Sequence, residues 1–192
     1  MRSLVQGIRI AAVASLVVAG VVQAQSGVGV GYSDVGPVVG LGGLNGASLA
    51  FGGRYEKVIK PLPDLGDGLL GIQVGADWYS WDWGYAGGTS SVSVIPIGVT
   101  ANYHFKMENK KVDPFLGAGL GYQIYNASCT YLGVDYCANA WSSGVYFITK
   151  AGIRYFTSES MALYADAGVG AAAFDVGVTW KMGGGSNASR SR

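Results

Sequence analysis

Apolar and small residues alternate along a central stretch of the chain, Asp113 to Tyr125, which reads D-P-F-L-G-A-G-L-G-Y-Q-I-Y. Every second position is apolar, at Leu116, Ala118, Leu120, Tyr122 and Ile124. The positions between them, from Gly117 to Gln123, hold glycines and one glutamine. A period of two predicts a β-strand with one apolar face and one face that is almost bare of side chains. Such a strand suits a narrow closed barrel whose apolar face contacts lipid.

The same alternation recurs along the chain and predicts eight strands, at 26–34, 47–58, 69–82, 91–105, 113–125, 141–156, 161–171 and 173–182. We therefore expect an all-β fold, an eight-stranded antiparallel up-and-down transmembrane β-barrel that occupies residues 25–182. The composition agrees, because 49% of the 192 residues are hydrophobic, only 13% are charged, and 32 are glycine. No apolar run reaches the roughly 20 residues that a membrane helix needs.

The two ends of the chain differ from this pattern. In residues 1–24, Arg2 and Arg9 precede an uncharged apolar run that ends in V-Q-A, which predicts a signal peptide cut after Ala24. The alternative, a membrane anchor, needs a longer apolar core. Residues 183–192 read G-G-G-S-N-A-S-R-S-R and predict a flexible polar tail.

The segment P-F-L-G-A-G-L-G-Y, with a basic turn before it and a hydrophilic loop after it, resembles small bacterial outer-membrane β-barrel proteins. We mean the porin-like group that holds the OmpA membrane domain, OmpX, OmpW and the opacity proteins. The resemblance implies an integral protein of the bacterial outer membrane, surrounded by outer-membrane lipid and lipopolysaccharide. It also implies that both termini and the short turns face the periplasm.

The last predicted strand carries the pattern Phe174-x-Val176-x-Val178-x-Trp180. It resembles the aromatic-ended signal by which the outer-membrane insertion machinery recognises its clients. Members of the group commonly end at this aromatic residue, whereas here Lys181 and Met182 lead into the tail. Either the signal works internally or the tail is a remnant of a linker.

The predicted connections differ at the two ends of the barrel. Those at 59–68, 106–112 and 157–160 are compact, and lysines cluster in or beside the first two. The opposite ones, at 35–46, 83–90 and 127–140, contain no lysine or arginine, and the last of them holds Cys129 and Cys137. An oxidising compartment would join these two cysteines in a disulfide.

Aromatic residues lie near both ends of the predicted strands, as expected for the girdles at the two membrane interfaces. The outer group is Trp78, Trp81, Trp83, Tyr122 and Trp141, and the inner group is Tyr55, Tyr103, Phe105, Tyr155 and Trp180. The alternative for Trp78, Trp81 and Trp83 is a platform that stacks against the sugars of lipopolysaccharide.

A set of polar residues is predicted to face the barrel interior: Arg54, Glu56, Asp77, Gln123, Lys150, Arg154 and Asp166. Charges inside a barrel need partners, because burying an isolated charge is costly. The favoured interpretation is a polar network in the lumen that holds the barrel rigid. The alternative is a path for solutes or protons.

Several chemistries are disfavoured by the residues present. Without Arg2 and Arg9 the chain keeps 11 of its 13 basic residues against 12 acidic ones, a net charge of −1, so no nucleic-acid partner is expected. His104 is the single histidine and two cysteines lie apart from it, so we predict no catalytic site, metal site or cofactor. The predicted role is structural or surface interaction with a largely closed lumen. The alternative is a narrow channel or transporter for small or hydrophobic molecules, and an enzyme that modifies lipid A ranks third.

Overall fold

The computed structural model describes residues 27–184, apart from 86–87, 132–133, 136 and 138–140. The predicted signal peptide, 1–24, and residues 185–192 of the predicted tail lie outside this range. Nine strands and a short 3-10 helix are described: β1 (Ser33–Leu41), β2 (Leu49–Leu62), η1 (Pro63–Leu65), β3 (Gly68–Tyr85), β4 (Gly88–His104), β5 (Val112–Tyr131), β6 (Val134–Asp135), β7 (Gly144–Phe156), β8 (Met161–Val169) and β9 (Phe174–Gly183). In this part of the chain no helix has the length and apolar character needed to cross a membrane.

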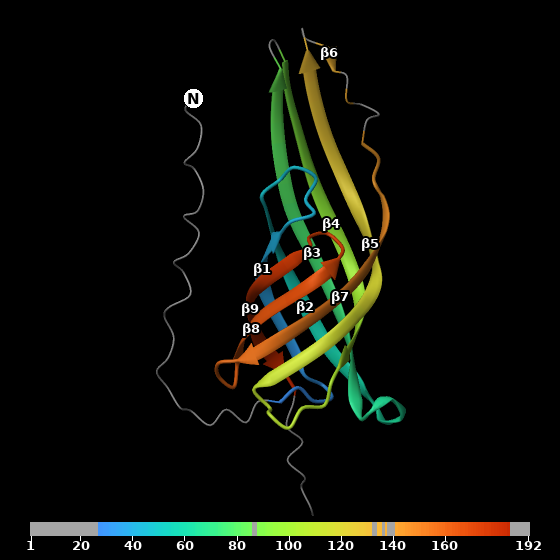
Figure 1. Cartoon of the computed structure of the whole chain (residues 1–192), viewed down its shortest axis with the longest axis vertical. Helices are drawn as coiled ribbons and strands as arrows, with labels where there is room; N and C mark the ends of the chain where they lie inside the picture. Colours follow the sequence, from blue (N-terminus) through green and yellow to red (C-terminus); the bar gives the residue numbers. More distant parts are fainter. Residues whose placement is uncertain (1–26, 86–87, 132–133, 136, 138–140, 185–192) are drawn as a thin grey trace, which may run out of the picture.

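Eight of the strands form a closed antiparallel ring (Figure 1). The order is β4-β3-β2-β1-β9-β8-β7-β5, and pairing of β4 with β5 closes it. The two-residue β6 pairs with the tip of β5. The eight-stranded barrel predicted from the sequence is therefore confirmed, and the first and last long strands lie side by side.

The first strand was predicted in the wrong place. The prediction put it at 26–34 and a loop at 35–46, but β1 covers Ser33–Leu41. Before β1 the chain bends at Gly31, whose φ is 84°, and the Gly31 amide donates to the Val58 carbonyl at 2.9 Å. Glycine adopts this left-handed conformation without strain, so the G-V-G-V-G run ends in a turn. The remaining predicted strands lie within a few residues of observed ones.

The glycine-rich strand β5 has the two faces that its sequence predicts. Leu116 and Leu120 face outward and are 51% and 52% exposed, whereas Gly117 and Gly121 are buried. A β-carbon on Gly119 would collide with the carbonyl oxygen of Val99 on β4. The backbone of the neighbouring strand therefore leaves no space for a side chain at this position, which explains this glycine by close packing of backbone.

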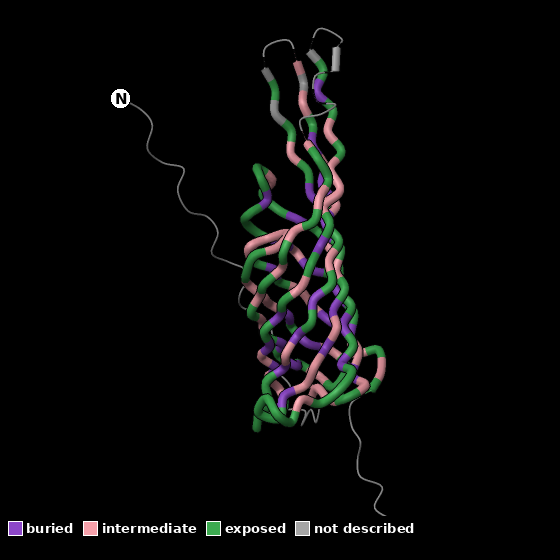
Figure 2. Tube along the Cα trace, turned by 90° about the vertical axis from the view of Figure 1, so that its right-hand side faces the viewer, coloured by how far each residue is buried: buried purple, intermediate pink, exposed green. Residues whose placement is uncertain are grey.

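Strands β3, β4 and β5 project well beyond the rest of the ring (Figures 1 and 2). Pairing of β2 with β3 ends at Trp78, and pairing of β5 with β7 ends at Gln123. We call the projecting part of β3–β5, together with the end of the barrel that bears it, the extension end. We call the opposite end, which carries the β2–β3, β4–β5 and β7–β8 connections, the turn end.

The polarity of the sheet inverts where the extension begins. Within the ring the outward face is apolar, whereas the next outward residues on the extension form two polar cross-strand rows: Ser80, Ser93 and Asn126, then Asp82, Ser91 and Ser128. The inward residues of the extension are apolar instead. The apolar outward face of β4 runs from Ile95 to Tyr103, about 27 Å of strand, or about 20 Å of height at the usual tilt, against the roughly 25 Å of a membrane band.

This inversion predicts where water meets lipid on β4. In lipid nanodiscs, which leave both faces of the bilayer accessible, Ser91→Cys is expected to react with a water-soluble maleimide at least tenfold faster than Ile97→Cys. The two side chains lie on the same outward face, so the difference reports depth and not orientation. Equal labelling rates at the two positions would contradict the placement of the lipid boundary.

Candidate functional site

Arg154 occupies the centre of the barrel interior near the turn end. It extends from β7 and is 0% exposed. Its Nε donates to Asp34 Oδ2 at 2.9 Å, its Nη1 donates to Asp113 Oδ2 at 3.0 Å, and its Nη2 donates to Glu56. The three carboxylates come from β1, β5 and β2, so a single guanidinium ties together strands from around the ring.

The carboxylate of Glu56 is surrounded by donors. Its Oε1 lies 2.8 Å from His104 Nε2 and accepts from Asn102 Nδ2 at 2.9 Å, and its Oε2 accepts from Gln73 Nε2 at 3.1 Å. The other ring nitrogen of His104 lies 2.9 Å from Asp113 Oδ1. These bonds compensate the desolvation of a carboxylate that is 0% exposed.

We call Arg154, Asp34, Glu56, Asp113 and His104 the Arg154 group. A second group lies next to it, toward the extension end. Lys150 Nζ donates to Asp166 Oδ2 at 3.1 Å and to the Tyr164 hydroxyl at 3.1 Å, and it also donates to Gln73 Oε1. The Tyr164 hydroxyl donates to Asp166 in turn. Gln73 therefore joins the two groups, since its amide nitrogen bonds to Glu56 and its oxygen to Lys150.

Two aromatic rings pack against the buried cations. Phe115 and Tyr164 stack at 5.8 Å between ring centroids, and both are nearly fully buried. The Arg154 guanidinium lies 5.1 Å from the Phe115 centroid, and Lys150 Nζ lies 5.9 Å from it. Ring faces attract cations, so this packing fills the lumen with side chains that also stabilise its charges.

A third group lies closest to the extension end. Arg54 on β2 donates through Nη1 to Asp77 Oδ1 at 2.8 Å and through Nη2 to Asp175 Oδ2 at 2.6 Å. Asp77 belongs to β3 and Asp175 to β9. Ion pairs thus lie at three levels of the lumen. Those of Arg154 and Arg54 join strands that are far apart in sequence, whereas Lys150 and Asp166 lie on the neighbouring strands β7 and β8.

Six of the seven residues predicted to line the lumen belong to these groups: Arg54, Glu56, Asp77, Lys150, Arg154 and Asp166. Gln123 does not, because it accepts from the Tyr125 hydroxyl at 2.8 Å on its own strand. The predicted network did not include Asp34, Gln73, Asn102, His104, Asp113, Tyr164 and Asp175. All of these occupy inward positions of their strands, the face to which alternation assigns them.

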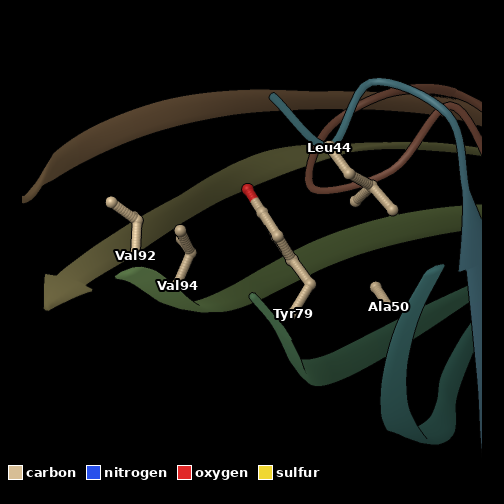
Figure 3. Packing of buried hydrophobic residues seen from close by; sticks show 5 residues of the cluster. All are labelled: Leu44, Ala50, Tyr79, Val92 and Val94. Carbon is tan, nitrogen blue, oxygen red and sulfur yellow. The ribbon is translucent and has the colours of Figure 1, made fainter. Parts of the chain in front are cut away.

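The interior changes character at the extension end, where an apolar cluster replaces the ion pairs. Tyr79, Val92 and Val94 point inward from β3 and β4, and Ala50 joins them from β2 (Figure 3). Leu44, from the β1–β2 connection, packs over them and is only 2% exposed. The cluster covers this end of the lumen with side chains that exclude water.

Two tryptophans predicted for the outer girdle belong to this cluster instead. Trp81 and Trp141 pack against it, with 5.5 Å between their centroids, and Tyr125 stacks on Trp141 at 5.6 Å. Trp81 faces inward because it lies on the extension, where the apolar face is the inner one. The side chain of Trp83 lies outside the described residues.

The other predicted girdle residues lie on the outward face of the barrel. Those at the extension end of the ring are Trp78 and Tyr122, which are 48% and 47% exposed. Those toward the turn end are Tyr55, Tyr103, Phe105, Tyr155 and Trp180. Tyr103 also donates to the Leu65 carbonyl in the β2–β3 connection, which fixes its ring at that edge.

Two hollows flank the Arg154 group along the barrel, one toward the turn end and one toward the extension end. A pocket of about 530 Å³ at the turn end is lined by residues before β1 and by the β4–β5 connection, and His104 and Asp113 belong to its lining. A smaller cavity lies in the middle of the lumen, with about 40 Å³ of space for the centres of water molecules. Gln73 and Lys150 line the smaller one, so the polar network reaches both hollows and separates them.

The disulfide predicted between Cys129 and Cys137 is confirmed, with 5.1 Å between the two Cα atoms. Cys129 lies on the part of β5 beyond the last residue paired with β7, so the bridge belongs to the extension and not to the ring. Closing so short a loop contributes about 2.5 kcal/mol of local stability. No group of three or more His, Cys, Asp or Glu among the described residues could hold a metal ion.

No protein-family model and no curated protein matches this chain. Solved structures do match. OprG from Pseudomonas aeruginosa is 10% identical, covers 82% of this chain and 99% of its own, and has a TM-score of 0.54. A de novo designed transmembrane β-barrel is 16% identical, covers 81% and 99%, and has a TM-score of 0.51. Neisserial surface protein A is 18% identical, covers 79% and 97%, and has a TM-score of 0.47.

The chain has the fold of a small outer-membrane β-barrel. At these identities the likeness concerns the fold, which is the fold predicted from the glycine-rich strand. The outward apolar face and the inward ion pairs follow the usual division of such a barrel into a lipid-facing and a lumen-facing surface.

Proposed function

We propose that the protein is an integral barrel of the bacterial outer membrane with a structural or surface-interaction role and no enzymatic activity. One observation carries the proposal: the fully buried Arg154 binds carboxylates from three strands and, with the Phe115 and Tyr164 rings, fills the lumen. A barrel of eight strands has an interior just wide enough for side chains. These residues therefore leave no continuous water path through the barrel.

The proposed orientation places the turn end in the periplasm and the extension outside the cell. Lys106 and Lys110 lie at the turn end, where the described chain ends at Gly27 and Gly184 also lie. The extension carries no lysine or arginine among its described residues. Its outward rows of serine and asparagine would then meet the sugars of lipopolysaccharide, which we propose as the surrounding partner together with outer-membrane lipid.

The experiment that tests location is fractionation after expression in a Gram-negative bacterium. We expect the protein in the outer-membrane fraction, with different gel mobility before and after boiling and a β-type circular dichroism spectrum. Trp180→Ala, in the proposed insertion signal on β9, should lower the assembled fraction severalfold. Trp78→Ala is the matched control, because Trp78 is outward and similarly exposed, at 48% against 45% for Trp180. Recovery in the soluble fraction, or equal effects of the two changes, would contradict the proposal.

A second candidate function, a narrow transporter of small molecules, is supported by the mid-lumen cavity. This cavity is partly open and is bordered by the β8–β9 turn. It lies on one side of the Arg154 group, so transport through the lumen would require that group to rearrange. A lipid A-modifying activity is less well supported, because both nitrogens of His104 are bonded to carboxylates and neither bonds to a hydroxyl nucleophile.

A further inference from the structure

His104, the last residue of β4, is held between carboxylates from two other strands. Its Nε2 lies 2.8 Å from Glu56 Oε1 on β2, and its Nδ1 lies 2.9 Å and 3.0 Å from the two carboxylate oxygens of Asp113 on β5. The residue is only 1% exposed, so these carboxylates and not bulk water are the partners of both nitrogens. Gly71 on β3 makes room for this arrangement, because a β-carbon there would collide with Glu56 and His104.

The donors and acceptors of this contact constrain the protonation of the ring. A neutral imidazole has one N–H donor and one bare nitrogen that only accepts. An ionised carboxylate also only accepts, so a neutral His104 would place a lone pair against a carboxylate oxygen at hydrogen-bond distance. Both contacts are favourable if both ring nitrogens carry a proton, or if one of the two carboxylates carries the additional proton instead.

The two carboxylates are poor places for that proton. Glu56 accepts further hydrogen bonds, from Asn102 Nδ2 at 2.9 Å on one oxygen and from Arg154 on the other. The Oδ2 of Asp113 accepts from Arg154 Nη1 at 3.0 Å. Hydrogen bonds of this kind favour the ionised form of a carboxylate, and so does a neighbouring guanidinium. The additional proton therefore belongs on His104.

The charge balance of the Arg154 group favours the same assignment. The group holds three carboxylates and one guanidinium, so its net charge is −2 with a neutral ring and −1 with an imidazolium. A buried net charge is costly, and the proton halves it. The charged or titratable residues around the ring, in the Arg154 group and in the turn-end pocket, are Tyr32, Asp34, Glu56, Asp113 and Arg154, then Asp67, Lys106 and Lys110.

We propose that His104 is a proton-binding site that keeps the imidazolium form at neutral pH. The bound proton makes His104 the second cation of the Arg154 group, and it ties β4 to β2 and β5 as Arg154 ties β7 to β1, β2 and β5. His104 and Asp113 line the turn-end pocket, so the proton exchanges with solvent at that end of the barrel. This role goes beyond the proposed function, because it does not depend on where in the cell the barrel resides.

The proton links stability to pH in one direction. The folded protein binds one proton more than the unfolded chain, in which an exposed histidine releases its proton near about pH 6.5. The stability that this proton contributes is complete below that pH and is lost as the pH rises to the value at which the folded ring releases it. Between these two values the folding equilibrium constant should fall about tenfold per pH unit because of His104.

NMR of ¹⁵N-histidine-labelled, tag-free protein in detergent tests the proposal, because His104 is the single histidine and gives one pair of ring signals. We expect both nitrogens to remain protonated at pH 8, where an exposed histidine is only about 3% protonated. Asp113→Asn removes one facing carboxylate and should lower the titration midpoint by about one pH unit or more. Asp67→Asn is the matched control, because Asp67 lines the same pocket but is 61% exposed, and it should leave the midpoint unchanged.

The pH dependence of unfolding supplies a second test. In urea titrations in lipid vesicles, the unaltered protein should lose about tenfold in folding equilibrium constant between pH 7 and pH 8, relative to His104→Gln, which cannot hold the proton. Ring signals of one protonated and one bare nitrogen in the folded, unaltered protein at pH 7.5 would overturn the proposal. So would equal midpoint shifts from Asp113→Asn and Asp67→Asn, or the same pH dependence in the unaltered protein and His104→Gln.

Discussion

Arg154→Met is expected to destabilise the folded barrel by about 3–5 kcal/mol, because it leaves buried carboxylates without their shared partner. Asp34, Glu56 and Asp113 are each at most 5% exposed, and each accepts a hydrogen bond from this guanidinium. Methionine has similar length and fills much of the same volume. The loss of stability therefore reports the missing charge and hydrogen bonds more than a cavity left by the substitution.

Unfolding by urea in lipid vesicles, followed by tryptophan fluorescence, measures this change. Lys106→Met is the matched control, since it also removes one positive charge from an ion pair. Lys106 bonds to Asp67 at 3.0 Å, but the two side chains are 67% and 61% exposed. Such a pair contributes about 0–1 kcal/mol. Equal losses from the two substitutions would show that the Arg154 group does not hold the barrel together.

Asp166→Ala is expected to cost about 3–5 kcal/mol, whereas the double change Lys150→Met with Asp166→Leu should stay within about 1 kcal/mol of the unaltered protein. The single change leaves the ammonium of Lys150 buried without its carboxylate. The two side chains are only 8% and 7% exposed and bond at 3.1 Å. Replacing both by apolar residues of similar volume removes the pair without leaving a charge behind.

The same unfolding measurement compares the two variants. Which of them is less stable matters more than either free energy of unfolding. A double variant less stable than Asp166→Ala would show that the pair is not electrostatically coupled. Lys150→Met alone completes the cycle, and a coupling energy near zero would place Lys150 and Asp166 in separate environments.

The strand count and the two faces of each strand were predictable, because a closed barrel imposes a period of two on every strand. The position of β1 was not. Both 27–31 and Ser33–Leu41 alternate small and apolar residues, and the choice between them depends on the bend at Gly31 and its bond to Val58 on another strand. A contact between segments distant in sequence therefore decides where β1 lies. Alternation within one segment carries no information about such a contact.

The aromatic residues illustrate a second limit of the sequence. Trp78 and Trp81 lie close together on β3, yet one faces lipid and the other faces inward onto the apolar cluster. Which face of a strand is apolar depends on whether the strand is still inside the bilayer. That boundary becomes visible only when Ser80, Ser93 and Asn126 are seen to form one row across three strands.

For the residues that line the lumen, in contrast, alternation identifies the correct face. Asp175 and His104 occupy inward positions that alternation alone could assign, and both proved to belong to the ion-pair groups. Their partners could not be assigned, because pairing across the lumen joins residues as far apart as Asp34 and Arg154. Alternation identifies the face on which a side chain lies, and the closure of the ring decides which side chains it meets.

Conductance in planar bilayers measures whether packed and paired side chains close the lumen. The folded, unaltered protein is expected to give no stable porin-like current, and replacing Lys150 and Tyr146 by glycine should open at most small, noisy currents, since Arg154 and its partners remain. Steady conductance of solute size from the unaltered protein would show that the lumen is open, because it would require a continuous water path past Arg154.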